Sequence, residues 1–357
     1  MTTAMESMLE QALGALEVLR DRGMTAGNSQ RMKAAYLTGV GEAESLVVGE
    51  MTVPRPKENE VLVRVRAVSV TPSEFQWFTT FRLPFGEPRQ FPIVLGHDFS
   101  GVVAALGGKV TGFRVGDEVF GLNDWFSNGA QAEYCTINAN ALARKPRSLN
   151  HAAAAVVPIP ALAAWQGLFD HAKLKRGQRV LIHDVTGSVG SFAVQMAHWR
   201  GAYVIATILS GNADFARSLG ADEVIDCRTT RFEDTASNVD VVFDSVGGDL
   251  LGRSWGVLAK GGRAVTIAPQ SLAASDHRVR DAFVQVRADG ALLTALAHLI
   301  DVGQIRVFVG KTYPLAEVRT AYASARQGKL HGHAALRLDD QISGDYQAPI
   351  NRAGDII

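Results

Sequence analysis

The chain has 357 residues, 47% of them hydrophobic, and its 36 basic and 36 acidic side chains balance to a formal net charge of zero. This length and composition can bury a large core, in two domains or in one large one. The charge balance argues against nucleic acid or an anionic membrane surface as the main partner. No apolar run reaches the roughly 18 to 20 residues that span a bilayer, so no membrane segment is expected.

Two cysteines, Cys135 and Cys227, are too few for a disulfide framework or for a zinc lobe built from several cysteines. The N-terminus carries Glu6 and Glu10 where a secretory signal has Lys or Arg. We therefore expect a cytoplasmic protein in a reducing compartment.

Residues 1–32 form an N-terminal extension. Apolar residues recur every three or four positions from Met5 to Leu19, which predicts an amphipathic helix. Residues 22–30 are a polar linker that contains glycine. None of these residues carries recognisable chemistry, so the extension is expected to pack as an accessory helix, to mediate oligomer contacts or to be partly disordered.

Residues 33–157 are predicted to form a partly open β-barrel. In residues 60–70, Val61, Val63 and Val65 point to one side of a strand and the intervening residues to the other. Further short strands separated by glycine turns follow along this segment.

Residues 158–303 are predicted to form a dinucleotide-binding domain. A helix-rich crossover broken by Pro158 and Pro160 leads into it, and residues 179–226 then have the pattern strand, glycine turn, helix, strand, helix, strand. Residues 304–338 become strand-like again and are expected to return to the first domain. Residues 339–357 are polar and poorly patterned, and an extended arm or a disordered tail is expected there.

The glycine turn is the strongest chemical signal in the chain. Gly187 and Gly190 directly precede and begin a helix, where a diphosphate can approach backbone N–H groups and the positive end of the helix dipole. Val185 stands where the dinucleotide fingerprint has its first glycine. The alternative is a glycine turn that joins a strand to a helix in another α/β protein, and the surrounding βαβ pattern argues against it.

Several motifs in order closely resemble the medium-chain dehydrogenase/reductase superfamily. They are AVSVTPSEF, VLGHDFSGVV, FRVGDEVFGL, VLIHDVTGSVGSFAVQMA, LGADEVID, VVFDSVGG and LAKGGRAVTI. The resemblance covers residues 33–338 and is nearest to the zinc-independent quinone oxidoreductase-like and enoyl reductase-like branch. It implies an α/β protein with a GroES-like, partly open β-barrel catalytic domain, a Rossmann doubly wound parallel sheet, and a substrate cleft between the two.

The same resemblance implies that no metal is used. Zinc alcohol dehydrogenases of the superfamily hold a catalytic zinc at the positions of Thr71, His97 and Pro158, and only His97 is a metal ligand here. One imidazole cannot form the three-ligand site that catalytic zinc needs. Without a Lewis acid, a conjugated acceptor suits the hydride better than a ketone or an alcohol. An enone, a quinone or an enoyl thioester such as an enoyl-CoA is therefore the expected small-molecule substrate.

The expected catalytic residues are Thr71, Arg82 and His97. Enoyl-thioester reductases of the superfamily carry a tyrosine proton donor a few residues after an asparagine-proline motif. This chain has Thr71 and Pro72 for that motif and Arg82 about where the tyrosine is expected. The Arg82 guanidinium can hold an enolate oxygen or a phosphate but is not an ordinary acid. His97 is expected as a structural or cleft-lining residue.

The expected cofactor is NADPH. The second strand of the Rossmann unit lacks the acidic residue that binds the ribose 2′-hydroxyl of NAD. Hydroxyl, amide and guanidinium groups nearby can hold a 2′-phosphate instead. The cofactor-binding residues expected from the motifs are Thr186, Gly187, Ser188, Val189, Gly190, Thr207, Ser210, Asn212, Arg228, Val246, Gly247 and Ile267.

Two other functions stay open on the sequence alone, a zinc-type alcohol dehydrogenase and an NADPH-binding protein without turnover. Analogy with the superfamily favours a homodimer formed through the cofactor domain.

Overall fold

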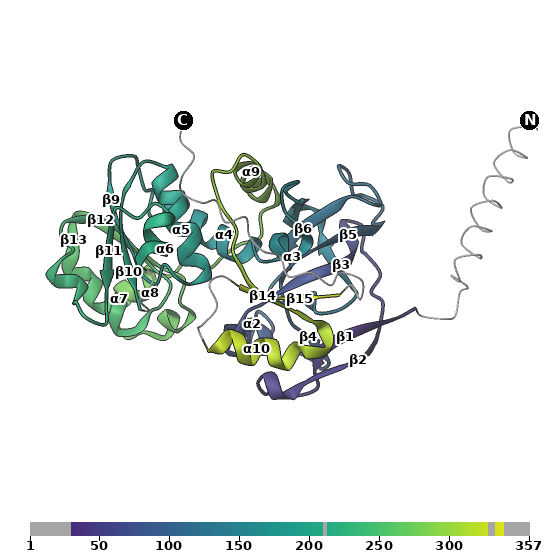
Figure 1. The fold of residues 1–357 in the computed structure, drawn as a ribbon. Helices are drawn as coiled ribbons and strands as arrows, with labels where there is room; N and C mark the ends of the chain where they lie inside the picture. Colours follow the sequence, from purple (N-terminus) through teal and green to yellow (C-terminus); the bar gives the residue numbers. More distant parts are fainter. Residues whose placement is uncertain (1–29, 210–212, 328–332, 339–357) are drawn as a thin grey trace, which may run out of the picture.

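The structure is a computed structural model that describes residues 30–209, 213–327 and 333–338. The helix expected over Met5–Leu19 and the tail of residues 339–357 lie outside the described residues. Figure 1 shows a barrel-like domain and a second domain around a parallel sheet, which lie side by side with α4 (Pro158–Trp165) between them. The α/β class and the combination of a GroES-like barrel with a Rossmann sheet are confirmed.

The barrel domain contains two sheets. The larger has the order β14-β15-β3-β5-β6-β8, with β7 also paired to β3, and the smaller has the order β2-β1-β4. The strands are β1 Arg31–Leu37, β2 Leu46–Thr52, β3 Glu60–Val70, β4 Ile93–Val94, β5 Asp98–Leu106, β6 Glu118–Leu122, β7 Tyr134–Asn138, β8 Leu142–Arg144, β14 Val309–Pro314 and β15 His333–Arg337.

Strand β3 organises the barrel as its sequence pattern predicts. Val61, Val63 and Val65 are buried, whereas Leu62 is half-buried and Arg64 is exposed. Burying one β-branched side of this long strand against the core explains why three strands, β5, β7 and β15, pair with it.

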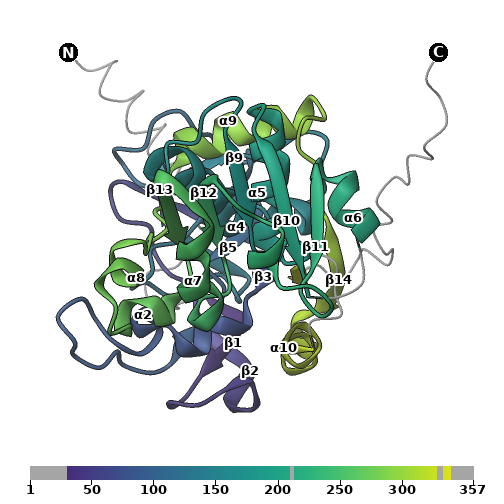
Figure 2. The same ribbon diagram turned by 90° about the vertical axis from the view of Figure 1, so that its left-hand side faces the viewer.

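The Rossmann sheet has five parallel strands in the order β11-β10-β9-β12-β13. Figure 2 looks onto this sheet, with β13 at one edge and β11 at the other. The strands are β9 Arg179–Ile182, β10 Tyr203–Ile208, β11 Glu223–Asp226, β12 Val239–Asp244 and β13 Leu258–Thr266. The strand order reverses between β9 and β12. Ligands of open α/β sheets bind at such a switch point, beyond the carboxyl ends of the strands.

Helices and short helical turns connect the strands of both domains. The α-helices are α2 Phe78–Phe81, α3 His151–Ala155, α4 Pro158–Trp165, α5 Ser188–Trp199, α6 Ala213–Ser218, α7 Gly248–Ser254, α8 His277–Asp281, α9 Gly290–Asp301 and α10 Val318–Arg326. A π-helical turn, Gln166–His171, extends α4. Short 3-10 turns are η1 Ala43–Ser45, η2 Pro72–Gln76, η3 Ala139–Ala141, η5 Phe232–Asp234, η6 Trp255–Val257, η7 Pro269–Ala273 and η8 Leu315–Glu317. None of the helices in the described ranges is long and apolar enough to cross a membrane.

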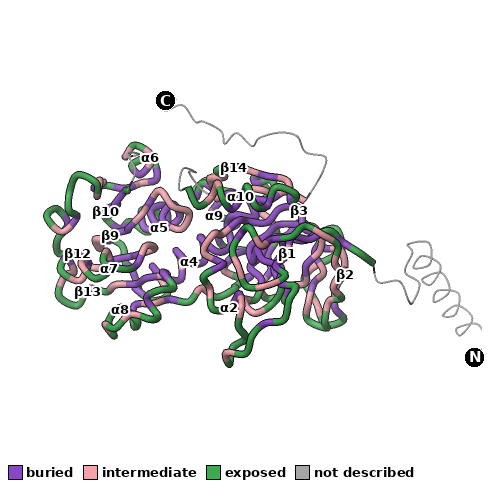
Figure 3. The backbone as a smooth tube through the Cα atoms, turned by 90° about the horizontal axis from the view of Figure 1, so that it is seen from below, coloured by how far each residue is buried: buried purple, intermediate pink, exposed green. Residues whose placement is uncertain are grey.

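A single hydrophobic cluster connects the two domains through α4. It runs from Phe120 and Leu122 on β6, through Leu162, to Ile182 and Phe243 in the Rossmann sheet. Figure 3 shows the buried backbone concentrated along α4 and the strands on either side of it. The two domains are therefore packed against each other by the same kind of apolar burial that stabilises each of them.

Two glutamine side chains hold the chain on the Rossmann domain on either side of α9, after which it crosses back to the barrel. The Gln166 amide donates to the Arg287 carbonyl at 2.8 Å and accepts from the Arg287 N–H at 2.9 Å. Gln195 makes the same pair of bonds with Arg306, at 3.1 and 2.8 Å. Strands β14 and β15 then join the barrel sheet, where Ala334 is opposite Val70 of β3.

Candidate active site

A cavity of about 530 Å³ lies where the two domains meet. It combines the carboxyl-end loops of β9 and β12, at the switch point of the Rossmann sheet, with the loops that follow β3 and β6 of the barrel. The barrel contributes Thr71, Trp77, Phe78, Trp125, Phe126 and His333. The Rossmann domain contributes Asp184, Gly187, Ser188, Val189, Ser245 and Ile267 among others. Among the described residues that line this cavity there is no lysine and no arginine.

The glycine loop between β9 and α5 forms one wall, and its shape requires Gly190. A Cβ at Gly190 would lie 2.1 Å from the Asp184 carbonyl oxygen and 2.7 Å from the Val185 Cα, so only glycine lets α5 approach the loop this closely. Helix α5 then presents its first N–H groups and its positive dipole end to the cavity. This backbone cradle fits the diphosphate of a dinucleotide.

A buried histidine fixes the base of the loop. The two imidazole nitrogens of His183 bond to the Thr207 hydroxyl at 3.0 Å and to the Ser254 hydroxyl at 2.8 Å. Burial lowers the pKa of His183 to about 4, so this imidazole is neutral at pH 7. Thr207 is itself buried and also accepts from the Asp184 N–H, at 3.4 Å. It therefore shapes the loop from behind and does not line the cavity.

The loop after β12 is held by Asp244, which is fully buried. Its carboxylate accepts from the N–H groups of Val246 and Gly247 at 2.9 to 3.1 Å and from the Thr266 hydroxyl at 2.6 Å. Gly247 has a φ of 77°, the left-handed region that favours glycine. These contacts present Ser245 to the cavity and keep Val246 and Gly247 just outside its lining.

The barrel supplies an aromatic wall. The Trp77 and Trp125 rings meet edge to face with centroids 5.1 Å apart, and the Trp125 indole N–H donates to the Val286 carbonyl at 2.8 Å, across the domain boundary. Phe78 and Phe126 extend the wall. Thr71 interrupts this apolar surface, and its hydroxyl oxygen is buried without a hydrogen-bond partner among the described residues. It is thus a polar group still available to a ligand.

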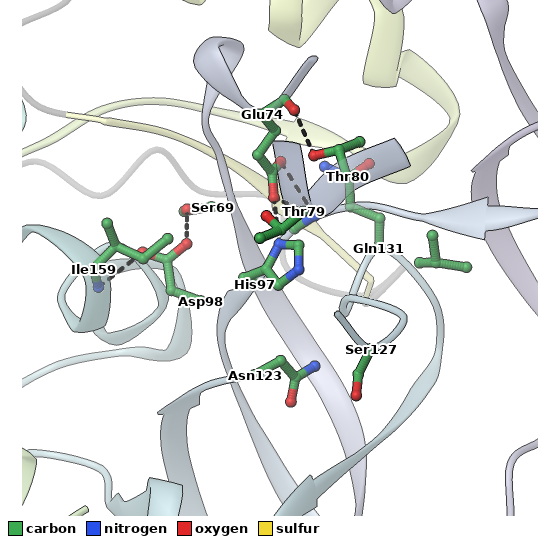
Figure 4. A network of polar contacts seen from close by, with 12 residues as sticks. Ser69, Glu74, Thr79, Thr80, His97, Asp98, Asn123, Ser127, Gln131 and Ile159 are labelled. Atoms are coloured by element: carbon green, nitrogen blue, oxygen red, sulfur yellow. Dashed lines mark hydrogen bonds and ion pairs between the residues drawn. The ribbon is translucent and has the colours of Figure 1, made fainter. Parts of the chain in front are cut away.

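Behind the aromatic wall lies a buried polar network centred on Glu74 (Figure 4). One Glu74 oxygen is 2.6 Å from His97 Nδ1, the other accepts from the Tyr322 hydroxyl at 3.0 Å, and the Gly96 N–H donates to both at 3.1 and 3.2 Å. Gln131 donates to the Tyr322 oxygen at 2.8 Å. The network fixes η2, which directly follows Thr71, against the barrel.

Asp98 links the barrel to helix α4. Its carboxyl group accepts from the Ser69 hydroxyl and from the Ile159 N–H of α4, the latter at 3.4 Å. Burial raises the pKa of Asp98 to about 7. Its contacts join β5 to the first turn of α4, and it does not line the cavity.

The structure brings together five of the residues selected from the sequence, namely Thr71, Gly187, Ser188, Val189 and Ile267. Thr186, Gly190, Thr207, Val246 and Gly247 support the same loops without lining the cavity. Ser210 and Asn212 lie outside the described residues.

Three further selected residues lie away from the cavity, and of these His97 was also expected in a structural role. Arg82 is exposed and donates to the Gly86 carbonyl at 2.9 Å within its own turn, so it does not reach the cavity. His97 is 1% exposed and lies behind Trp77 and Trp125, with ring centroids at 6.1 and 5.3 Å. The Arg228 guanidinium is paired with Asp226 at 2.6 and 3.0 Å, so it is not held ready for a phosphate.

Two titratable cavity residues, Asp184 and His333, were not selected from the sequence. Asp184 directly precedes the glycine motif, and an acidic residue so close to the expected diphosphate site could have been noticed in the sequence. His333 reaches the cavity only because β15 pairs with β3, which places Ala334 opposite Val70 and next to Thr71. No sequence pattern reveals that register.

Comparison with known proteins agrees with this architecture. Residues 57–147 match the family model of the alcohol dehydrogenase GroES-like domain, and residues 219–336 match that of a zinc-binding dehydrogenase. A mitochondrial NAD(P)H oxidoreductase of Mus musculus, RTN4IP1, is 30% identical over 329 residues, which cover 78% of this chain and 82% of that protein. The chain belongs to the medium-chain dehydrogenase/reductase superfamily. It is an oxidoreductase of the quinone oxidoreductase-like branch.

Further relatives within the superfamily support this placement. A 2-methylene-furan-3-one reductase of Solanum lycopersicum is 31% identical over 316 residues, which cover 85% of this chain and 79% of that protein. The solved structure of the quinone oxidoreductase from Coxiella burnetii superposes with a TM-score of 0.79 at 27% identity, and the match covers 87% of this chain and all of that one.

The residues of this superfamily member do not fit a catalytic zinc, although one matching family model is described as zinc-binding. His97 Nε2 is buried without a partner, but the nearest motif positions supply only the Thr71 hydroxyl and Pro158. The described part of the chain contains no group of three His, Cys, Asp or Glu side chains able to hold a metal ion. A catalytic zinc needs three such ligands.

Proposed function

We propose that this protein is a zinc-independent, NADPH-dependent reductase that delivers a hydride to the activated C=C bond of an enone or a quinone. The observation that carries the proposal is the cavity, where the glycine loop of the Rossmann domain meets Thr71 and an aromatic wall from the barrel. A bound nicotinamide cofactor supplies the hydride.

The residues of the cavity suggest how the acceptor is activated. The Thr71 hydroxyl, which has no hydrogen-bond partner in the described part of the chain, donates a hydrogen bond to the carbonyl oxygen of the acceptor and stabilises the negative charge that develops there. Trp77, Phe78, Trp125 and Phe126 stack on a flat conjugated substrate and exclude water. Water is the proposed source of the proton.

The charge of the lining favours an enone or a quinone over an enoyl thioester such as an enoyl-CoA. Coenzyme A carries several phosphates, and proteins hold phosphates with Arg and Lys. The described residues that line this cavity include neither.

The preference for NADPH rests on the end of β10. No acid follows Ile208 in the sequence before Asp214, which is paired with Arg217 at 3.2 Å. Asp226, opposite Ile208 on β11, is paired with Arg228 at 2.6 Å, so the carboxylates described at this strand end are compensated and repel a 2′-phosphate less. Binding of NADPH and NADH, compared by calorimetry, tests this preference. Equal affinity, or tighter binding of NADH, would refute it.

The reductase activity is tested with a panel of enones, quinones and enoyl-CoA thioesters. Thr71→Val removes the hydroxyl and should slow turnover by about 10²-fold or more, whereas Thr71→Ser keeps it and should stay near wild type. Metal analysis and dialysis against a chelator accompany the assay. The proposal fails if no acceptor is reduced, or if activity needs stoichiometric zinc.

A further inference from the structure

The glycine loop contains an acid in an unusual backbone conformation. Asp184 has a φ of 55°, a left-handed value that few residues other than glycine adopt. Three backbone contacts hold it there: its N–H donates to the Thr207 hydroxyl, its carbonyl accepts from the Gly187 N–H at 3.2 Å, and the next residue, Val185, donates to the Thr207 carbonyl at 3.2 Å. The conformation is thus imposed by the loop, and the side chain has little freedom to leave it.

The Asp184 carboxylate lies in the cradle where the cofactor diphosphate is expected. It lines the cavity together with Gly187, Ser188 and Val189, at the N-terminus of the 12-residue helix α5. A Cβ on Gly187 would lie 2.8 Å from its Oδ2, which shows how closely the carboxylate covers the loop. Its Oδ1 accepts from the Thr186 hydroxyl at 3.1 Å.

Among the described residues that line the cavity, no Lys or Arg compensates this carboxylate. The other titratable group on the cavity wall is His333, and burial lowers its pKa to about 4, so it is neutral. Among the neighbouring elements, His183 at the end of β9 is neutral, and Asp244 at the end of β12 is a second carboxylate held by backbone N–H groups. A diphosphate therefore enters a site that already holds negative charge.

We propose that Asp184 couples dinucleotide binding to proton uptake, so that the cofactor diphosphate binds the form of the protein in which the Asp184 carboxyl is protonated. The inference rests on the proposed function only in requiring that a dinucleotide binds this loop.

The direction of the pH dependence follows from linkage. Burial already raises the pKa of Asp184 in the free protein, and a bound diphosphate raises it further because two negative charges repel. Affinity is constant below the free pKa. It then falls by up to about tenfold per pH unit until the pKa of the complex is passed, and levels off above it.

The experiment measures binding of ADP-ribose by calorimetry from about pH 5 to about pH 9, a range in which its diphosphate does not titrate. Wild type should bind more weakly as the pH rises and should take up protons, seen as a dependence of the heat on the ionisation enthalpy of the buffer. Asp184→Asn should bind with little pH dependence and more tightly than wild type at high pH. Asp234→Asn, which removes an exposed carboxylate from the same domain, is the matched control and should behave as wild type.

The possible outcomes separate this inference from the proposed function. A flat wild-type profile, or the same slope in Asp184→Asn, overturns the role of Asp184. A slope that disappears in His333→Gln and persists in Asp184→Asn assigns the proton to His333 and also overturns it. If Asp184→Asn does not fold, Asp184→Gly, which suits the left-handed backbone, replaces it. Absence of binding of both ADP-ribose and NADPH at every pH, in wild type and in every variant, overturns the dinucleotide site and with it the proposed function.

Discussion

Replacing Glu74 by alanine should destabilise the protein more than any other single change in the barrel network. The carboxylate is fully buried, and its removal leaves the Gly96 N–H, His97 Nδ1 and the Tyr322 hydroxyl without an acceptor. Each unsatisfied buried group costs about 1–3 kcal/mol, and three groups lose their acceptor here. We expect Glu74→Ala to lower the free energy of unfolding by about 4 kcal/mol or more.

Two milder variants test whether the hydrogen bonds are responsible. Glu74→Gln keeps one acceptor oxygen and nearly the same shape, so it should cost about 1–2 kcal/mol. Tyr322→Phe removes one donor and should cost a similar amount, partly because Gln131 loses its partner. Urea unfolding followed by tryptophan fluorescence measures all three. A loss below about 1 kcal/mol in Glu74→Ala, or equal losses in Glu74→Ala and Glu74→Gln, would refute the reasoning.

Three further predictions concern the glycine loop before α5, the pH dependence of stability and the reactivity of the two cysteines. Gly190→Ala should abolish ADP-ribose binding, because its Cβ would lie 2.1 Å from the Asp184 carbonyl oxygen and push α5 away; calorimetry showing wild-type affinity would contradict this. The pKa of Asp98 is about 7 in the folded protein and about 4 in the unfolded chain, so folding takes up a proton between these values. The contribution of Asp98 to the free energy of unfolding should therefore be largest below about pH 4 and should decline up to about pH 7. In urea titrations at several pH values, Asp98→Asn should lack this pH-dependent contribution. Burial raises the pKa of Cys135 to about 12, so a thiol reagent should label the half-buried Cys227 in the native protein and Cys135 only after unfolding; native labelling that persists in Cys227→Ser would argue otherwise.

Local patterns predicted much of the fold. The alternation in β3, the glycine turn before α5 and the strand that follows it all express spacing within a few residues, and the structure contains each of them. Such patterns can be recognised in the sequence because residues a few positions apart determine which face of a strand is buried and where a turn needs glycine. The domain architecture followed from several such patterns in order.

The site was only partly predictable because its decisive contacts join distant parts of the chain. Tyr322 reaches Glu74 across 248 positions, and Trp125 reaches the Val286 carbonyl across 161. Arg82 was selected by its distance from Thr71 along the sequence, yet a local turn directs its side chain to its own loop. Sequence spacing gives no information about these choices.

The hydrophobic cluster that passes through α4 has a consequence for how this protein loses its structure. Because the barrel and the Rossmann sheet share Leu162 and its neighbours as interior, neither domain can melt without exposing the apolar surface of the other. The two domains should behave as one cooperative unit, with a single calorimetric transition. A substitution that disturbs the packing of either domain should then also change the shape of the cavity, because α4 supports both of its walls.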